Sequence, residues 1–321
     1  MLIGYRSVLA LFLVIAAGTS AAQVWPAKPV KIIVAGAPGS APDVIARLIG
    51  DRLSQKWGQQ FVVDNRPGAA GNLGTAAAAQ APADGYNFLF GQAAPLAMNR
   101  LTFKTLNFDP ERDFVPVVSL GLSPMMIAVN NDLPVRTVQD LIELAKSRPG
   151  RINFGTSSSR NIPHLTGELL INMTGIRLVH VPYKSNPQAA AETMSGQVHV
   201  YIDGVPAMAG HLKSGRLRII ATSSAKRLPN FPDIPAVAET VPGFEFNGWF
   251  CVMAPTGTPP AIVAALNRDV NEVLKIPDIA SRMLGFGMYD AGGTTEELAR
   301  FISAERQNFA RAVKAAGIQP E

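Results

Sequence analysis

Cysteine is almost absent from this 321-residue sequence, which holds a single one, Cys251. One thiol cannot form an intrachain disulfide, and no cysteine follows the N-terminal segment to carry a lipid anchor. Cys251 lies within the apolar run Trp249 to Ala254. This setting indicates a small buried hydrophobic residue and not a reactive thiol.

Long hydrophobic runs are also missing, except at the N-terminus. There Arg6 precedes the uncharged run Val8 to Ala17, and small residues follow, ending at Ala22. This is the pattern of a secretory signal peptide, and the run is too short to span about 30 Å of hydrocarbon. We expect residues 1–22 to be removed on export, so that a soluble periplasmic protein begins near Gln23.

Strong charge of either sign is lacking as well. The sequence has 29 Lys and Arg against 24 Asp and Glu, and loss of Arg6 with the signal peptide leaves 28 against 24, a net charge of +4. So small an excess excludes a strongly basic nucleic-acid surface, although it favours anionic solutes. We therefore expect no nucleic-acid partner.

Metal and nucleotide motifs are absent too. The histidines show no H-E-x-x-H or Cys/His zinc spacing, and each is predicted to be a helix-cap, strand-face or surface residue. They are His164, His180, His199 and His211. No Gly-Lys-Ser/Thr follows the first glycine turn, which excludes a nucleotide P-loop there. The sequence predicts no metal site and no cofactor.

The sequence does contain a regular alternation of predicted strands and helices. Short β-branched runs predict strands at Val30 to Ala35, Phe61 to Val63, Phe88 to Gly91, Met125 to Asn130, Ile152 to Phe154, Arg177 to Val181, Val198 to Asp203, Leu217 to Ala221 and Trp249 to Met253. Apolar residues spaced by three and four predict helices at Val44 to Leu53, Val138 to Ala145, Leu165 to Met173, Ile262 to Leu274 and Leu298 to Val313. The alternation indicates an α/β fold with mixed, mostly parallel sheets and flanking helices.

About 300 mature residues exceed what one hydrophobic core usually serves, so two lobes are expected. No segment is long enough to be a linker, which favours a chain that crosses twice between the lobes. Met125 to Val129 and Trp249 to Met253 are predicted to lie side by side as a two-strand hinge. We expect residues 23–124 and 252–321 to form lobe 1 and residues 125–251 to form lobe 2.

The first candidate site is the turn Pro38 to Asp43, which follows a buried strand and opens a helix. Open α/β sheets receive ligands at such turns. Ser40 and Asp43 are spaced as a capping box, and Gly39 and Ala41 would offer backbone N–H groups near the positive end of the helix. An ordinary strand-to-helix turn remains the alternative.

Gly71 and Asn72 form the second candidate site, in the glycine-rich turn Asp64 to Gly74 that enters an Ala-rich helix. The glycine spacing fails the dinucleotide pattern G-x-G-x-x-G. Glycines would let the backbone approach a small ligand, or they would serve the turn alone. Gln92, at the end of the next expected strand, is a further candidate ligand-binding residue.

A third polar cluster, Gly155 to Asn161, lies between a strand and a helix. Its hydroxyls, backbone donors and one guanidinium suit a carboxylate. The candidate ligand-binding residues here are Thr156, Ser157, Ser158, Ser159 and Arg160. No G-x-S-x-G nucleophile elbow is present. Catalysis by a serine would also require the fold to bring a His and an acid together. The sequence does not show whether it does, so this alternative stays open at this point.

Asp203 ends an expected strand and precedes Gly204. Its carboxylate would lie at the edge of the sheet where the strand ends. It would accept a hydrogen bond from a ligand hydroxyl or amine, or it would cap the helix that begins near Pro206. The sequence leaves both roles open.

Taken together, these segments resemble the periplasmic receptors of tripartite tricarboxylate transporters, the Bug family. The resemblance runs through nearly the whole mature chain. It is carried most clearly by Asn65 to Asn72, Ala83 to Tyr86, Val181 to Lys184 and Ala254 to Pro259. It implies a two-lobed type II periplasmic-binding-protein fold, in which backbone donors and ordered water from both lobes hold a carboxylate.

Carried over by position, the resemblance assigns ligand contacts to Pro38 to Asp43, Gly71 and Asn72, Thr156 to Ser159, and Asp203. This chain departs from the family pattern inside that shell. Pro42 lacks an N–H where the family pattern has one, Gly204 replaces an amide side chain, and Ser159 and Arg160 enter a glycine-rich loop. The resemblance therefore predicts the fold and role better than the substrate.

These observations predict a monomeric, non-enzymatic receptor that captures a small organic carboxylate and delivers it to membrane transporter subunits. Two alternatives stay open on the sequence alone. One is an exported serine hydrolase that uses Ser157 or Ser158. The other is a sensor that presents its closed form to a signalling protein, since transport and sensing use the same closure.

Overall fold

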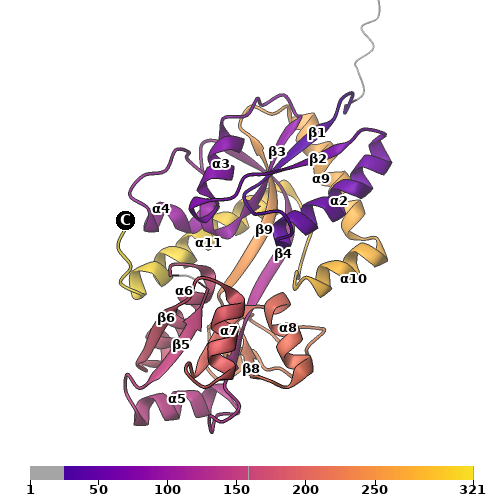
Figure 1. Ribbon diagram of the computed structural model, residues 1–321. Coiled ribbons are helices and arrows are strands. Elements are labelled where there is room, and N and C mark those ends of the chain that lie inside the picture. The colour runs from indigo at the N-terminus through magenta and orange to yellow at the C-terminus, as the bar shows by residue number, and fades with distance from the viewer. Residues whose placement is uncertain (1–24, 158, 321) are drawn as a thin grey trace, which may run out of the picture.

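The computed structural model describes residues 25–157 and 159–320 (Figure 1). The predicted signal peptide, residues 1–22, and the candidate residue Ser158 lie outside these ranges. Within them the chain forms a mixed sheet with helices packed on it, which confirms the predicted α/β class.

The sheet joins nine strands in the described ranges, in the order β2-β1-β3-β9-β4-β7-β5-β6, with β8 also paired to β4. The strands are β1 (Val30–Val34), β2 (Phe61–Asn65), β3 (Asn87–Gln92), β4 (Phe114–Val129), β5 (Ile152–Thr156), β6 (Leu178–Pro182), β7 (Val200–Gly204), β8 (Arg218–Thr222) and β9 (Asn247–Pro255). The pairs at its two ends are parallel, and every pair made by β4 or β9 is antiparallel.

Helices cover the sheet on both sides. The α-helices are α2 (Ala41–Trp57), α3 (Asn72–Ala79), α4 (Asn99–Thr102), α5 (Val138–Ser147), α6 (Ile162–Thr174), α7 (Asn186–Met194), α8 (Val205–Ser214), α9 (Pro260–Leu274), α10 (Pro277–Gly285) and α11 (Thr295–Ala315). Shorter helical turns are η1 (Ala69–Gly71), η2 (Ala94–Met98) and η3 (Val237–Glu239). The long amphipathic helices α2, α9 and α11 lie where apolar spacing predicts them.

β4 and β9 connect the two halves of the molecule, which appear in Figure 1 as an upper and a lower part. β4 pairs with β9 from Phe114 to Pro124, and from Met125 onward it pairs with β7 and β8 instead. The 16-residue strand therefore belongs to both halves of the sheet.

The predicted pairing of Met125 to Val129 with Trp249 to Met253 was wrong. Trp249 lies opposite Leu122, seven residues before Val129. The apolar run after Pro124 is only the second part of β4. The first part of β4 contains Pro116 and Gly121, and both residue types are typical of turns. In the structure, β-bulges at these two positions keep them within the strand.

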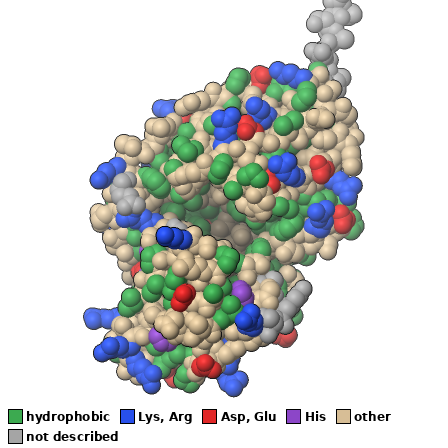
Figure 2. All heavy atoms as spheres, viewed as in Figure 1, with side chains coloured by type: hydrophobic (Ala, Val, Ile, Leu, Met, Phe, Trp, Pro, Cys, Tyr) green, Lys and Arg blue, Asp and Glu red, His purple; other side chains and the backbone are tan. Residues whose placement is uncertain are grey.

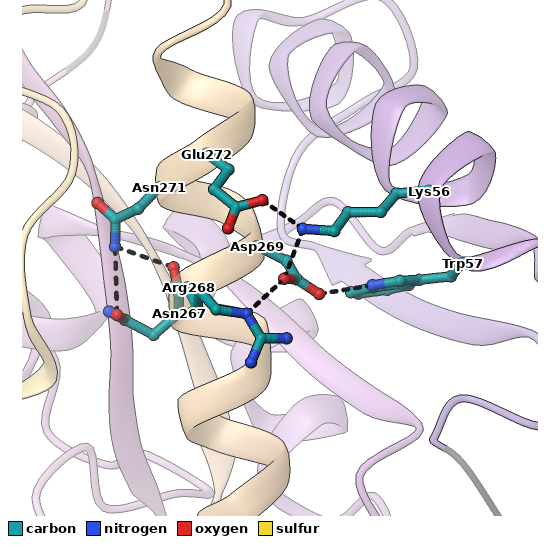
Figure 3. A network of polar contacts seen from close by, with 7 residues as sticks. All are labelled: Lys56, Trp57, Asn267, Arg268, Asp269, Asn271 and Glu272. Atoms are coloured by element: carbon teal, nitrogen blue, oxygen red, sulfur yellow. Dashed lines mark hydrogen bonds and ion pairs between the residues drawn. The ribbon is translucent and has the colours of Figure 1, made fainter.

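A polar network fixes the outer helices of the first half (Figure 3). Asp269 on α9 is 2% exposed and accepts hydrogen bonds from Lys56 Nζ at 2.8 Å, Trp57 Nε1 at 2.7 Å and Arg268 Nε at 3.0 Å. Burial alone would raise the pKa of Asp269, but these bonds outweigh it and hold the pKa below its ordinary value. The network anchors the C-terminal end of α2, whose other end reaches the cleft.

Candidate functional site

A cleft of about 620 Å³ lies between the two halves, and Figure 2 shows it as a hollow edged by hydrophobic side chains. Its walls combine segments that are far apart in the sequence. The first half contributes residues 35–37, Ala41, 67–68, 70–71, 92–94 and Met98. The second half contributes residues 159–163, Asn186, 203–204 and 206–207, and residues of β4 and β9 with Phe286 complete the walls. The candidate turns of both halves therefore meet at one cavity.

Strand alternation decides which residues of the connecting strand reach the cleft. Ser123 and Met125 line it, whereas Leu122 and Pro124 line a separate cavity on the other side of β4. Side chains alternate between the faces of a strand, so this division follows from the backbone alone. Trp249 and Phe250 on β9 also contribute to the cleft wall.

Several helices begin at the cleft. Ala41 is the first residue of α2, Ile162 of α6 and Asn186 of α7, and Pro206 lies in the first turn of α8. The first turn of a helix carries N–H groups without intrahelical acceptors and a partial positive charge. Their convergence from both halves gives the cleft a preference for an anion.

The first predicted turn is only partly in the cleft. Ala41 lines it, but Gly39, Ser40 and Asp43 are not among the lining residues. The predicted capping box was wrong, because the Ser40 hydroxyl donates to Ala37 O at 2.6 Å and makes no cap hydrogen bond. Asp43 Oδ2 instead accepts the Gly39 N–H at 2.8 Å.

Asp43 is held in a hydrogen-bond network of the first half. Its Oδ1 accepts from Arg47 Nε at 3.0 Å, and Arg47 Nη2 donates to Asn65 Oδ1 at 3.1 Å. The Asn65 amide then donates to Gly36 O, which fixes a backbone segment of the cleft wall. Burial would raise the pKa of Asp43, but the bonds from Arg47, Gly39 and Asn65 outweigh it and lower the pKa.

The second predicted turn brings its backbone to the cleft. Gly71 lines the wall with φ of +90°, a left-handed conformation that glycine adopts without strain. Asn72 is not among the lining residues, and its Oδ1 accepts from Asn99 Nδ2 at 2.6 Å. Gln92 does line the cleft, and its Nε2 donates to Ala35 O at 3.2 Å.

The third cluster divides in the same way. Ser159 and Arg160 line the cleft, whereas Thr156 and Ser157 do not. Thr156 is fully buried, with Oγ1 at 2.8 Å from His180 Nε2, and Ser157 Oγ accepts from the amide of Asn161 at 3.3 Å. The hydroxyls of Thr156 and Ser157 therefore make contacts within the second half.

Asp203 lies in the cleft wall and is 7% exposed. Its Oδ2 accepts from the Tyr201 hydroxyl at 2.5 Å, and its Oδ1 accepts from Gly204 N–H at 2.7 Å. Burial raises the pKa of Asp203, and these two hydrogen bonds offset the rise only in part. Both roles considered from the sequence remain compatible with this position.

Sequence reasoning missed several cleft residues. These are Ser123, Met125, Asn161, Asn186, Trp249, Phe250 and Phe286. Asn186 had a usable signal, because Ser185 before it and Pro187 after it mark a helix start. Trp249 and Phe250 had none, since an apolar strand residue gives no sign of which face will meet a cavity.

Residues 45–318 match the sequence profile described as tripartite tricarboxylate transporter family receptor. The chain belongs to this family of solute receptors. Within the described ranges no helix combines the length and apolar character needed to cross a membrane, and no group of three or more His, Cys, Asp and Glu side chains is arranged to hold a metal ion.

Three comparisons place the chain within the family. It is 35% identical to Protein BugT of Bordetella pertussis over 315 residues, which cover 97% of each chain. A solved structure of R. palustris Rpa4515 with adipate is 38% identical, with a TM-score of 0.82 over 92% of this chain and all of that one. The structure of the periplasmic binding protein BugD is 28% identical, with a TM-score of 0.76 over 92% of this chain and 100% of that one.

Proposed function

We propose that the protein captures a small organic carboxylate in the cleft and delivers it to the membrane subunits of a tripartite transporter. The observation that carries this proposal is the convergence of helix N-termini from both halves on one cavity. An anion held between them would contact both halves at once. It would therefore stabilise a closed form by its differential contacts.

The lobes in this proposal are residues 23–124 with 252–321, and residues 125–251. The change of β4 partners between Pro124 and Met125 supports a division there. We also propose that the chain is exported through residues 1–22 and acts as a monomer. The finding of adipate in Rpa4515 supports a carboxylate as the solute.

The proposed ligand contacts are the backbone at Ala41 and Gly71 and the side chains of Gln92, Ser159, Arg160 and Asp203. Gly39, Ser40, Asp43, Asn72, Thr156 and Ser157 would support them without touching the solute. Each charge-assisted hydrogen bond to the anion contributes about 1.5 to 3 kcal/mol. Several such bonds are enough for micromolar affinity, which requires about 8 kcal/mol.

The family is one of receptors and not of enzymes, and we propose that this chain catalyses no reaction. Ser157 Oγ accepts from an amide, His180 pairs with Thr156, and His164 accepts the Arg160 N–H. None of these contacts activates Ser157 as a nucleophile. Turnover of generic ester substrates that is lost in Ser157→Ala would overturn this part.

A thermal-shift panel tests the proposal. Small carboxylic acids, with adipate as the first probe, are compared with their methyl esters. At least one acid is expected to raise the melting temperature in proportion to the logarithm of its concentration, because it binds the folded state alone. Its ester, which keeps the carbon skeleton but loses the charge, should have little effect. Equal stabilisation by acids and esters would contradict an anion site.

A further inference from the structure

Two histidines without a role in the proposed capture lie next to the Ser159–Arg160 turn. The rings of His164 on α6 and His180 on β6 stack with centroids 3.9 Å apart and an interplanar angle of 19°. His164 is 9% exposed. The pair is thus packed behind the part of the second half that reaches the cleft.

His164 ties this turn to the helix. The ring Nδ1 of His164 accepts the backbone N–H of Arg160 at 3.0 Å, and the backbone N–H of His164 donates to Asn161 Oδ1 at 2.9 Å. Arg160 has φ of +59°, and a non-glycine residue keeps such a conformation only where its surroundings hold it. The Nδ1 contact is a specific hydrogen bond that holds the backbone of Arg160 in this conformation.

The geometry points to His164 as a positioning residue that holds the Ser159–Arg160 turn in the cleft wall while its ring is neutral and releases it when the ring is protonated. An imidazole nitrogen accepts a hydrogen bond only while it carries no proton. The neutral tautomer with its proton on Nε2 accepts from Arg160 and faces Glu168 Oε1, 3.3 Å away. A second proton, on Nδ1, would point at the Arg160 N–H and remove the bond.

The His164 ring has an acidic group on one side and two aromatic rings on the other. Glu168 Oε1 lies 3.3 Å from its Nε2. Phe154 and His180 lie against the ring from the sheet. Burial, and then the neighbouring His164, lower the pKa of His180 to about 4. His180 is therefore expected to stay neutral between pH 7.5 and pH 5.

NMR of the ligand-free mature protein tests this tether without any solute. Between pH 7.5 and pH 5 we measure the ¹⁵N shifts of the His164 ring and the exchange protection of the Arg160 amide, corrected for intrinsic exchange. Protection is expected to fall by about twofold to about tenfold as the ring titrates, the range for loss of one hydrogen bond. His199→Asn, a change at another histidine of the same half, should leave this pH dependence intact.

Two variants separate the acceptor from the ring. His164→Asn keeps an acceptor near the Nδ1 position that does not titrate, so Arg160 should stay protected at every pH. His164→Phe keeps a ring in the stack without an acceptor, so Arg160 should be unprotected at every pH. Wild-type protection in His164→Phe, or wild-type pH dependence in His164→Asn, would overturn the tether. If His164→Phe does not fold, the His164→Asn comparison decides alone.

A consequence for capture, which rests on the proposed function, is weaker binding of a carboxylate such as adipate at pH 5 in wild type but not in His164→Asn. Calorimetry with adipate measures it. Loss of the Arg160 bond on titration, together with no binding of any acid in the panel, would contradict the proposed function and leave the tether standing. Binding of an acid with no change in the protection of the Arg160 amide would contradict the tether and leave the proposed function standing.

Discussion

Asp43 and Asp203 both lie near a junction between a strand and a helix. Asp43 is in the first turn of α2, and Asp203 is the residue before the last one of β7. Both are buried, at 3% and 7% exposure. Asp43 is paired with Arg47 and is not among the residues that line the cleft, and its pKa is lowered. Asp203 faces the cleft, accepts from a hydroxyl and a backbone N–H, and has a raised pKa. The same residue type is therefore paired with a cation outside the cleft lining in one half and placed in the cleft wall without a cation partner among the described contacts in the other.

The largest expected effect concerns Asp43. Asp43→Ala removes acceptors from Gly39 and Arg47, and losing a charged hydrogen bond costs about 1.5 to 3 kcal/mol. We expect a loss of about 2 to 3 kcal/mol in the free energy of unfolding, measured in urea. Asp43→Asn, which keeps one acceptor oxygen, should lose less. A variant with wild-type stability and reduced solute affinity would show that Asp43 is a ligand contact.

Asp203 should give the opposite result. Asp203→Asn is expected to weaken binding of a carboxylate that also carries a hydroxyl or amine by about 1 to 3 kcal/mol, measured by calorimetry. Stability should not fall, because the ionised carboxylate is costly to bury without a cation. Unchanged affinity combined with a lower melting temperature would assign Asp203 to helix capping instead.

The pH dependence of stability sharpens the contrast. Asp43, with a lowered pKa in the folded state, contributes stability above its ordinary pKa near 3.8, and this is lost as pH falls through the lowered value. Asp203, with a raised pKa, does the reverse: wild type gains stability as pH falls through the raised value toward 3.8. The difference in the free energy of unfolding between Asp203→Asn and wild type should thus shrink as pH falls from 7. The greater stability of wild type over Asp43→Asn should persist until pH falls below 3.8.

A smaller effect is expected at Tyr201. Tyr201→Phe removes the hydroxyl that donates to Asp203 and should cost about 0.5 to 1.5 kcal/mol of stability. It should also raise the pKa of Asp203 further, which carbon-detected NMR of the carboxyl measures. Tyr183→Phe is the matched control, because Tyr183 makes no hydrogen bond to either aspartate within the described part of the chain and should leave that pKa unchanged. An unchanged pKa in Tyr201→Phe would contradict the role of the hydroxyl.

The fold was largely predictable because apolar periodicity is a local signal. α2 and α11 carry long amphipathic patterns and were found close to their observed limits. β4 was found only in its second part, since Gly121 and Pro124 interrupt a strand that tertiary pairing nevertheless completes. The length of β4 is set by its pairing with β7, β8 and β9, which are distant in the sequence. A local sequence pattern does not indicate such pairing.

The candidate site was predictable at the level of turns but not of side chains. The three predicted turns and Asp203 do meet at one cleft. The pairing of Asp43 depends on Arg47 one helical turn later, and that of Asp203 on Tyr201 two residues earlier on the same strand. Ser157 and Thr156 likewise turn toward Asn161 and His180, contacts that exist only after the chain folds.

Solution scattering tests the central claim most directly, because the claim requires a carboxylate to draw the two halves together. The mature protein is measured alone, with an acid that the thermal-shift panel shows to bind, and with the methyl ester of that acid. The account predicts a smaller radius of gyration with the acid and an unchanged one with the ester. Saturating acid that leaves the radius unchanged, or an ester that compacts the protein equally, would contradict closure around an anion.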